Sequence, residues 1–336
     1  MDMLRIAFLE IPPSLFEARK EQPMKKKDPK KPWRNIFPAI AIPFNKDYSV
    51  NEGELRRYAR WLASIEGIDG LVCNGHTGEI TSLNREEKRR ITEILVEEVG
   101  DKVLVISGIA GDEGTLDAID RAKEVQAVGA DGILLMPPHV WLRFGMKPES
   151  PVRYFQDVGR AIDMGIIIHQ YPFDCKAFYP VDMVLQMARI PNVKTLKCGI
   201  RHMAVYERDV GILRQKAPNL TILSCMDEYL MSTLYIGVDG ALVGFAGLIP
   251  ELIAEAWKAV QANDFVKTRK LQAKIFPLAQ AVYQIGQPSG EAHARLKEAL
   301  RQRGVFSSAR MRPPVMPISD REKKNVAAAL KTAGLK

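Results

Sequence analysis

Two lysines lie in one short apolar stretch of the chain, which reads NVKTLKCGI from residue 192 to residue 200. Lys194 and Lys197 are three residues apart, and side chains alternate between the faces of a strand, so the two lysines are expected on opposite faces. Partial burial of an ammonium group disfavours its charged form, which lowers its pKa and makes a nucleophilic amine available near neutral pH. Such a lysine can form a Schiff base with a carbonyl substrate.

A regular alternation of apolar runs and helical segments decides where these lysines lie. The apolar runs, each of which we expect to form a strand, occupy residues 36–44, 70–75, 103–110, 132–138, 165–172, 193–198, 220–225 and 240–247. They are apolar on both faces, as parallel strands covered by helices are. Eight such units predict an α/β fold, a (β/α)8 TIM barrel. The alternative, a doubly wound open sheet, is disfavoured because no GxGxxG follows the first strand.

Composition and pattern divide the chain into three parts. Residues 35–262 hold the strand–helix units and are expected to form the barrel. Residues 1–34 are rich in charge and proline, which predicts a basic, flexible N-terminal extension. Residues 263–336 contain further helical segments and a Pro-rich strip, RMRPPVMPIS, and predict an appended C-terminal helical extension. Within the barrel, Asn84 and Glu87 are spaced as a helix-capping box.

The net charge of +8 comes from the two ends of the chain. Residues 1–34 carry nine Lys or Arg against five Asp or Glu, and residues 301–336 carry nine against two, so the central part is mildly acidic. It has no basic stripe interleaved with aromatics, and we expect no nucleic-acid partner. No apolar run is long enough to span a bilayer, and Glu10 interrupts the opening apolar patch before it reaches the length of a signal sequence. The four cysteines are far apart, which favours a reduced, cytoplasmic protein with no membrane partner.

The polar residues that could do chemistry come at the downstream ends of the apolar runs. The C-terminal ends of the strands of a (β/α)8 barrel meet at its mouth, where active sites lie. We therefore expect one cluster there, made of His76, His139, His169, Tyr171 and Lys197. Lys197 shares its parity with the β-branched Val193 and Thr195, which suits the barrel interior, whereas Lys194 would reach solvent near the opposite end.

Four motifs, in this order along the barrel pattern, resemble the dihydrodipicolinate synthase and N-acetylneuraminate lyase family of Schiff-base-forming, class I aldolase-type lyases. GHTGE at 75–79 looks like the family's G-[ST]-T-G-E loop, and TLKCG at 195–199 looks like its lysine strand. GVDGALVGFAG at 237–247 is similar to its strand-eight glycine segment, and RMRPPVMPIS to its closing strip. The resemblance covers residues 35–320.

The resemblance implies that Lys197 forms the Schiff base with pyruvate or a longer 2-oxo acid. It implies that the loop holds the carboxylate of the substrate through hydroxyl and backbone N–H donors, from residues Gly75, His76, Thr77 and Gly78, and that Leu242 of the strand-eight segment adjoins the substrate. It also implies a homotetramer or homodimer, without a metal or other cofactor.

The sequence departs from the family at the end of strand five. Most members have Tyr-Asn-x-Pro there, with tyrosine as the proton shuttle, whereas this chain has histidine at that place and a tyrosine two residues on. Either His169 or Tyr171 would then move protons, and we favour His169, whose ordinary pKa suits neutral pH.

Three further departures concern the substrate. His76 replaces the first hydroxyl residue of the loop, which leaves Thr77 as the hydroxyl that binds the carboxylate, and His139 corresponds to the strand-four tyrosine. Asp174 stands where the synthases use arginine to bind an acidic aldehyde. An anion there should reject that aldehyde, so we expect a less acidic or hydroxylated partner in place of authentic dihydrodipicolinate synthesis.

Three other functions stay open at this point. The first is authentic dihydrodipicolinate synthesis. The second is a metal-dependent barrel hydrolase or lyase, with ligands among His76, His139, His169, Glu79 and Asp174, although no tight ligand pair supports it. The third is a non-catalytic protein that binds a 2-oxo acid without proton transfer.

Overall fold

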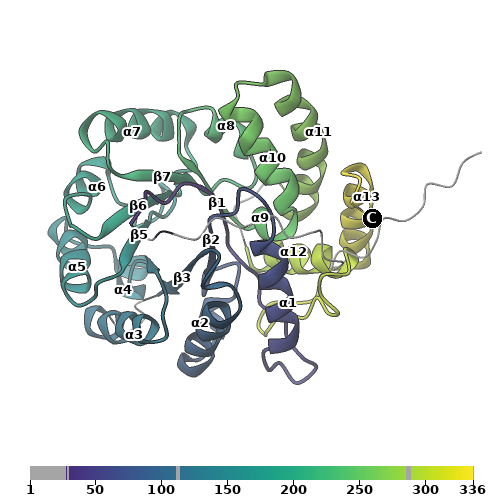
Figure 1. Ribbon diagram of the computed structural model, residues 1–336, viewed down its shortest axis with the longest axis horizontal. Coiled ribbons are helices and arrows are strands. Elements are labelled where there is room, and N and C mark those ends of the chain that lie inside the picture. The colour runs from purple at the N-terminus through teal and green to yellow at the C-terminus, as the bar shows by residue number, and fades with distance from the viewer. Residues whose placement is uncertain (1–27, 29, 111–113, 285–288, 336) are drawn as a thin grey trace, which may run out of the picture.

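The computed structural model describes residues 28, 30–110, 114–284 and 289–335, and eight parallel strands form its centre. The strands are β1 (Asn35–Pro38), β2 (Gly70–Cys73), β3 (Leu104–Ile109), β4 (Gly132–Leu135), β5 (Gly165–His169), β6 (Val193–Cys198), β7 (Thr221–Ser224) and β8 (Gly240–Val243). Each hydrogen-bonds to its neighbours in the order β1-β8-β7-β6-β5-β4-β3-β2. Single bridges, Ile36 to Ile68 and Ala39 to Val72, bring β1 beside β2. The sheet is a nearly closed barrel, and the predicted (β/α)8 fold is confirmed (Figure 1).

Helices surround this barrel on the outside (Figure 1). They are α1 (Glu52–Ala63), α2 (Arg85–Val99), α3 (Thr115–Ala127), α4 (His139–Phe144), α5 (Glu149–Arg160), α6 (Val181–Met187), α7 (Met203–Lys216), α8 (Leu230–Leu234), α9 (Phe245–Leu248), α10 (Pro250–Gln261), α11 (Phe265–Val282), α12 (Gly290–Gln302) and α13 (Asp320–Thr332), with a short 3-10 helix, η1 (Ile80–Ser82). The capping box predicted for α2 is present, because Asn84 accepts from the Glu87 N–H at 2.8 Å and Glu87 accepts from the Asn84 N–H at 3.0 Å. None of the helices among the described residues has the length and apolar character needed to cross a membrane.

The barrel has one apolar layer inside the strands and another between the strands and the helices. Phe37, Leu223 and Leu242 belong to the inner layer, and Leu196 and Cys198 belong to the outer one. Trp33 is 1% exposed and closes the bottom of the barrel, since its ring lies against the first residues of β4 and β5, where only glycines leave room. Of the basic extension predicted for residues 1–34, residues 1–27 and 29 lie outside the described residues. Trp33, within the described part, packs as part of the barrel.

A bulge in β6 changes which of its side chains face inward. Ile166 pairs with Val193, but Ile167 pairs with Thr195, so Lys194 is an extra residue in the ladder. Val193 therefore packs in the outer layer, and the expectation that it shares a face with Thr195 and Lys197 is wrong. Lys194 lies at the bottom of the barrel, where its Cγ approaches Gly165, the first residue of β5.

The C-terminal helices α11, α12 and α13 gather on one side of the barrel, beside α1 and α10 (Figure 1). Helix α12 lies against α9, the short helix that follows β8. The predicted C-terminal helices are thus present, and α12 is placed next to the mouth of the barrel.

Candidate active site

Lys197 is the last inward-facing residue of β6. It pairs in register with His169 of β5 and with Leu223 of β7, and Leu223 belongs to the inner layer of the barrel. Because residues in register on neighbouring strands face the same side, the side chain of Lys197 points into the barrel near its mouth. Burial lowers the pKa of Lys197, an effect that the nearby Cys225 and Asp227 oppose.

Three rings lie against one another at the ends of β2 and β5, and one of them, His169, is the partner in register of Lys197. The ring centroids of His169 and Tyr171 are 4.9 Å apart, those of His76 and His169 are 5.4 Å apart, and those of His76 and Tyr171 are 5.6 Å apart. The Tyr171 hydroxyl lies 3.1 Å from Nε2 of His76, which is hydrogen-bonding distance. We call these three residues the ring cluster.

The two histidines of the ring cluster differ in exposure but share a low pKa. His169 is 5% exposed, and its Nδ1 has no hydrogen-bond partner among the described residues. Burial, with the charge of Lys197, holds its pKa well below the ordinary value. His76 is exposed at the mouth, yet the surrounding protein and the same lysine also lower its pKa. Both imidazoles are therefore neutral near pH 7, so each can accept a proton as well as donate one.

The GHTGE loop folds into tight turns between β2 and η1. The N–H groups of Gly78 and Ile80 donate to the Gly75 carbonyl at 3.1 and 3.2 Å. Within the described residues, the N–H groups of His76 and Thr77 donate to no protein atom. Thr77 is 9% exposed, and its hydroxyl faces Gly244 at the end of β8. The loop thus offers two unused N–H donors and a hydroxyl, which together suit a carboxylate.

Asp227 is a buried carboxyl group that the sequence analysis did not identify. It accepts from the N–H groups of Gly244 at 3.2 Å and Phe245 at 2.7 Å, which begin α9. Burial raises its pKa to about 7, although these hydrogen bonds and the charge of Lys197 oppose the shift. Tyr283, which follows α11, brings its hydroxyl beside Gly244, and burial raises its pKa well above the ordinary value.

His293 of α12 is a second residue missed at this site. It is 9% exposed, and burial together with the positive charges of Lys197 and Lys297 lowers its pKa to about 4. The spacing of four residues between His293 and Lys297, which places both on one face of a helix, was the available signal. The sequence pattern assigns α12 to an extension of the barrel, and that assignment gives no reason to expect a residue of this helix at the mouth.

Three other predicted residues lie outside the ring cluster. His139 is exposed and begins α4, and Asp174 is exposed in the loop after β5. Leu242 is fully buried in the inner layer, two residues before Gly244. Among the described residues, no group of three or more His, Cys, Asp or Glu could hold a metal ion, so the metal-dependent alternative finds no ligand set in this part of the chain.

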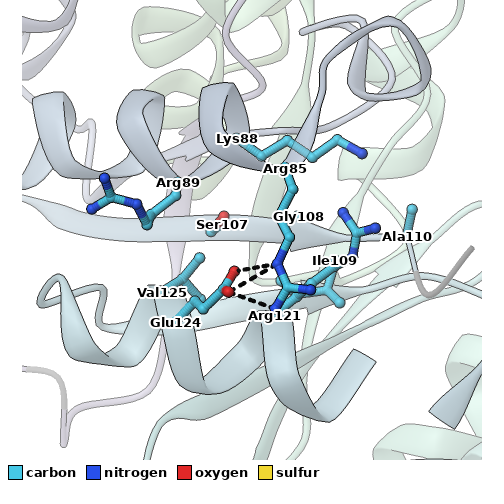
Figure 2. Close-up of a pocket in the computed structure, with 10 residues that line it drawn as sticks. All are labelled: Arg85, Lys88, Arg89, Ser107, Gly108, Ile109, Ala110, Arg121, Glu124 and Val125. Carbon is cyan, nitrogen blue, oxygen red and sulfur yellow. Dashed lines mark hydrogen bonds and ion pairs between the residues drawn. The ribbon is translucent and has the colours of Figure 1, made fainter. Parts of the chain in front are cut away.

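A hollow between α2 and α3 lies over the end of β3, apart from the ring cluster (Figure 2). Arg85 binds Glu124 there, with its Nε 2.8 and 3.0 Å from the two carboxylate oxygens. Arg121, also in its wall, binds Asp117 at 2.8 Å. Because these cations already have carboxylate partners, we assign no site to the hollow.

Comparison with known proteins places the chain in a family. The model of the dihydrodipicolinate synthetase family matches residues 32–333. The 4-hydroxy-tetrahydrodipicolinate synthase of Acidiphilium cryptum is 30% identical over 299 residues, which are 88% of this chain and 97% of that protein. An Escherichia coli protein named "Probable 2-dehydro-3-deoxy-D-pentonate aldolase YjhH" is 25% identical over 309 residues, 91% of this chain and 99% of that protein.

Solved structures agree in fold. The dihydrodipicolinate synthase of Thermotoga maritima has a TM-score of 0.82 at 22% identity, over 91% of this chain and 100% of that one. YagE, a prophage protein of Escherichia coli solved in complex with pyruvate, has a TM-score of 0.82 at 23% identity, over 90% of this chain and 99% of that one. On the match of its sequence along nearly the whole barrel and the C-terminal helices, the chain belongs to the dihydrodipicolinate synthetase family, whose members are lyases that act on small molecules.

Proposed function

We propose that the protein is a Schiff-base lyase that acts on pyruvate or a longer 2-oxo acid through Lys197. The inward position of Lys197, in register with His169 and with a lowered pKa, is the observation that carries the proposal. The free amine attacks the ketone carbon of the substrate, and loss of water gives an iminium. The N–H groups of His76 and Thr77, which donate to no described protein atom, bind the substrate carboxylate together with the Thr77 hydroxyl.

The iminium withdraws electrons from C3 of the substrate. The bond between C3 and C4 can then break, so that an aldehyde leaves and an enamine forms, which is protonated at C3 and hydrolysed to release pyruvate. The reverse order gives condensation. Alternatively, removal of a proton from C3 gives an enamine that expels a hydroxide from C4, which is a dehydration. In each route the ring cluster supplies or removes the proton, with His169 nearest the imine and Tyr171 with His76 leading to the mouth.

The partner of the 2-oxo acid is proposed to be weakly acidic or hydroxylated. The exposed Asp174 would repel a second carboxylate, whereas buried acceptors such as Asp227 suit hydroxyl groups. The relative named as a pentonate aldolase supports a sugar acid. Authentic 4-hydroxy-tetrahydrodipicolinate synthesis is the second candidate, because the relative from Acidiphilium cryptum carries that name at 30% identity. We further expect a homodimer or homotetramer, which sedimentation would resolve.

Trapping of the imine tests the proposal. Cyanoborohydride in the presence of pyruvate should add one reduced pyruvyl group to the peptide that contains Lys197. Lys197→Met should abolish the adduct, whereas Lys194→Met, a change of the same kind at the bottom of the same strand, should leave it intact. An unmodified Lys197 peptide in the wild type would reject the covalent mechanism.

The second reactant needs a separate experiment. Release or consumption of pyruvate is followed with 2-deoxy sugar acids, with hydroxylated aldehydes and with aspartate semialdehyde. We expect turnover with the hydroxylated compounds and little with aspartate semialdehyde. Preferred turnover of aspartate semialdehyde would favour the synthase, and an adduct without turnover of any partner would favour a non-catalytic binder.

A further inference from the structure

A buried ion pair connects the GHTGE loop to the C-terminal helices. Nζ of Lys297, in α12, lies 2.8 Å from Oε1 of Glu79, the last residue of the loop. The side chain of Lys297 is 0% exposed and that of Glu79 is 4% exposed. The Lys297 ammonium also donates to the carbonyl of Arg310 and lies 4.3 Å from the centroid of the Phe44 ring. The Lys297 side chain is therefore fully enclosed, and its ammonium contacts a carboxylate, a carbonyl and an aromatic ring.

The second carboxylate oxygen of Glu79 is occupied as well. The backbone N–H of Arg312 donates to Oε2 of Glu79 at 3.0 Å. The guanidinium of Arg312 in turn binds Glu87 of α2 at 2.5 Å, and it donates to the carbonyl of Ser82 at 2.6 Å. Glu79 is therefore bound through one carboxylate oxygen to Arg312 of the Pro-rich strip and through the other to Lys297 of α12.

These contacts hold Glu79 in a backbone conformation that non-glycine residues rarely adopt. Its φ is +56° and its ψ is +39°, in the left-handed region. A residue in such a conformation costs about 1–3 kcal/mol and persists only where its surroundings determine it. A buried ion pair adds little net stability by itself, because desolvation of the two charges offsets their attraction. The arrangement is better explained as a means of fixing the loop in one conformation than as a source of stability.

The loop that ends at Glu79 carries the N–H groups of His76 and Thr77, for which the described residues provide no acceptor. Glu79 follows Thr77 by two residues, and its own N–H donates to the His76 carbonyl at 3.0 Å. A shift of Glu79 would therefore also move the N–H groups of His76 and Thr77 and the Thr77 hydroxyl, which lies beside Gly244.

We propose that Lys297 is a positioning residue, which holds Glu79 and thereby orients the Thr77 loop to bind the carboxylate of the 2-oxo acid. The C-terminal helices are on this account part of the substrate site and not only an appendage of the barrel. The inference rests on the proposed function, because it concerns the binding of a 2-oxo acid at Lys197. It adds a specific claim: Lys297 acts on recognition of the carboxylate and not on the reactivity of the Lys197 amine.

A comparison of two ketones isolates this claim. Pyruvate and acetone both form an imine with a lysine, but only pyruvate has a carboxylate for the loop to bind. The concentration of each ketone that gives half-maximal cyanoborohydride trapping at Lys197 is measured in the wild type and in Lys297→Met. We expect a rise of roughly tenfold or more for pyruvate, since a small misplacement of binding groups has large effects. The value for acetone should not change.

Arg295 offers a matched control on the same helix. It is 5% exposed, but its partners lie within the C-terminal helices: Glu322 of α13 at 2.8 Å and the carbonyl of Val282 at 2.6 Å. Arg295→Met therefore also removes a buried cation from α12 without touching the loop, and it should leave both half-saturation values as they are in the wild type. If Lys297→Met does not fold, the double variant Glu79→Gln/Lys297→Met, which removes both charges of the pair, and Glu79→Gln alone replace it in the same measurement.

The outcomes are distinct. A selective loss of pyruvate binding in the Lys297 or Glu79 variants supports the inference. Equal losses for both ketones, or the same result in Arg295→Met, would reduce Lys297 to a purely structural residue and overturn the inference. Absence of trapping in the wild type would instead reject the proposed function itself.

Discussion

The hydroxyl of Tyr171 lies 3.1 Å from Nε2 of His76, and these two residues are 95 positions apart in the sequence. One follows β5 and the other follows β2, so the pair exists only because the barrel brings the ends of these strands together. The ring of His169 contacts the rings of both residues of this pair. His169 is also the partner in register of Lys197 on the neighbouring strand. The ring cluster thus lies at the end of β5, beside the strand that carries Lys197.

The first prediction concerns proton transfer through this pair. Tyr171→Phe removes the hydroxyl and should lower turnover of a cleavable 2-oxo acid about 100-fold or more, as loss of a positioned acid–base group does. Trapping of pyruvate at Lys197 should persist, because imine formation needs the amine and the loop. Tyr179→Phe is the control, since the Tyr179 hydroxyl is buried and bonds to none of the described residues. Equal activity of Tyr171→Phe and the control would exclude Tyr171 from the relay.

The second prediction concerns the pH dependence of Lys197. Burial lowers its pKa below the ordinary value of 10.5, so the free amine should become available at a lower pH than in an exposed lysine. The rate of imine trapping should therefore rise with pH to a plateau, with a midpoint below 10.5. Asp227→Asn should move that midpoint still lower, because the carboxylate of Asp227 favours the charged ammonium. A midpoint at the ordinary lysine value would contradict the burial of the amine.

The third prediction concerns the stability contributed by Asp227. Its pKa is raised from 3.8 to about 7 in the folded protein, so between these values the folded state retains a proton that the unfolded chain has lost. The contribution of this carboxyl group to stability consequently falls as the pH rises through that window. Asp227→Asn does not titrate, so the free energy of unfolding of the variant minus that of the wild type should increase between about pH 4 and about pH 7. Urea denaturation at several pH values measures this difference, and a constant or decreasing difference would show that the pKa is not raised.

The fourth prediction concerns the absence of a side chain at Gly244. A Cβ atom there would lie 2.7 Å from the Tyr283 hydroxyl and 3.4 Å from Oγ1 of Thr77. Gly244→Ala should destabilise the protein by about 1–3 kcal/mol through overpacking against Tyr283, and it should also raise the half-saturating concentration of pyruvate because the added methyl group would lie against the Thr77 hydroxyl. Thermal unfolding and imine trapping measure the two effects.

Two further variants make this prediction specific. Tyr283→Phe in the Gly244→Ala background removes the clashing hydroxyl and should recover part of the lost stability. Gly211→Ala, in the middle of α7, meets no atom within 4 Å and should instead stabilise the protein by about 0.5–1 kcal/mol. A fully stable Gly244→Ala would mean that Tyr283 does not constrain the end of β8.

The sequence alone predicted the features that depend on local pattern. The eight apolar runs predicted the strands of the barrel because parallel strands that are covered by helices are buried on both faces. Asn84 and Glu87 predicted the start of α2 because capping is an interaction between residues three positions apart. The place of Lys197 at the downstream end of its strand followed from the same pattern, together with the rule that such ends meet at the mouth.

Only the tertiary structure decided which residues meet across the barrel. The bulge at Lys194 reverses the facing of Val193, and it depends on the pairing of β6 with β5 rather than on the sequence of β6. The contact of His76 with Tyr171 joins the segments after β2 and β5. The hydrogen bond from the Phe245 N–H of α9 to Asp227 joins the segments after β8 and β7. The pair of Lys297 with Glu79 spans 218 positions, and no periodicity in either segment could encode it. Local pattern determines an element, but the facing of side chains at a bulge and the partner that each side chain meets depend on the packing of the whole chain.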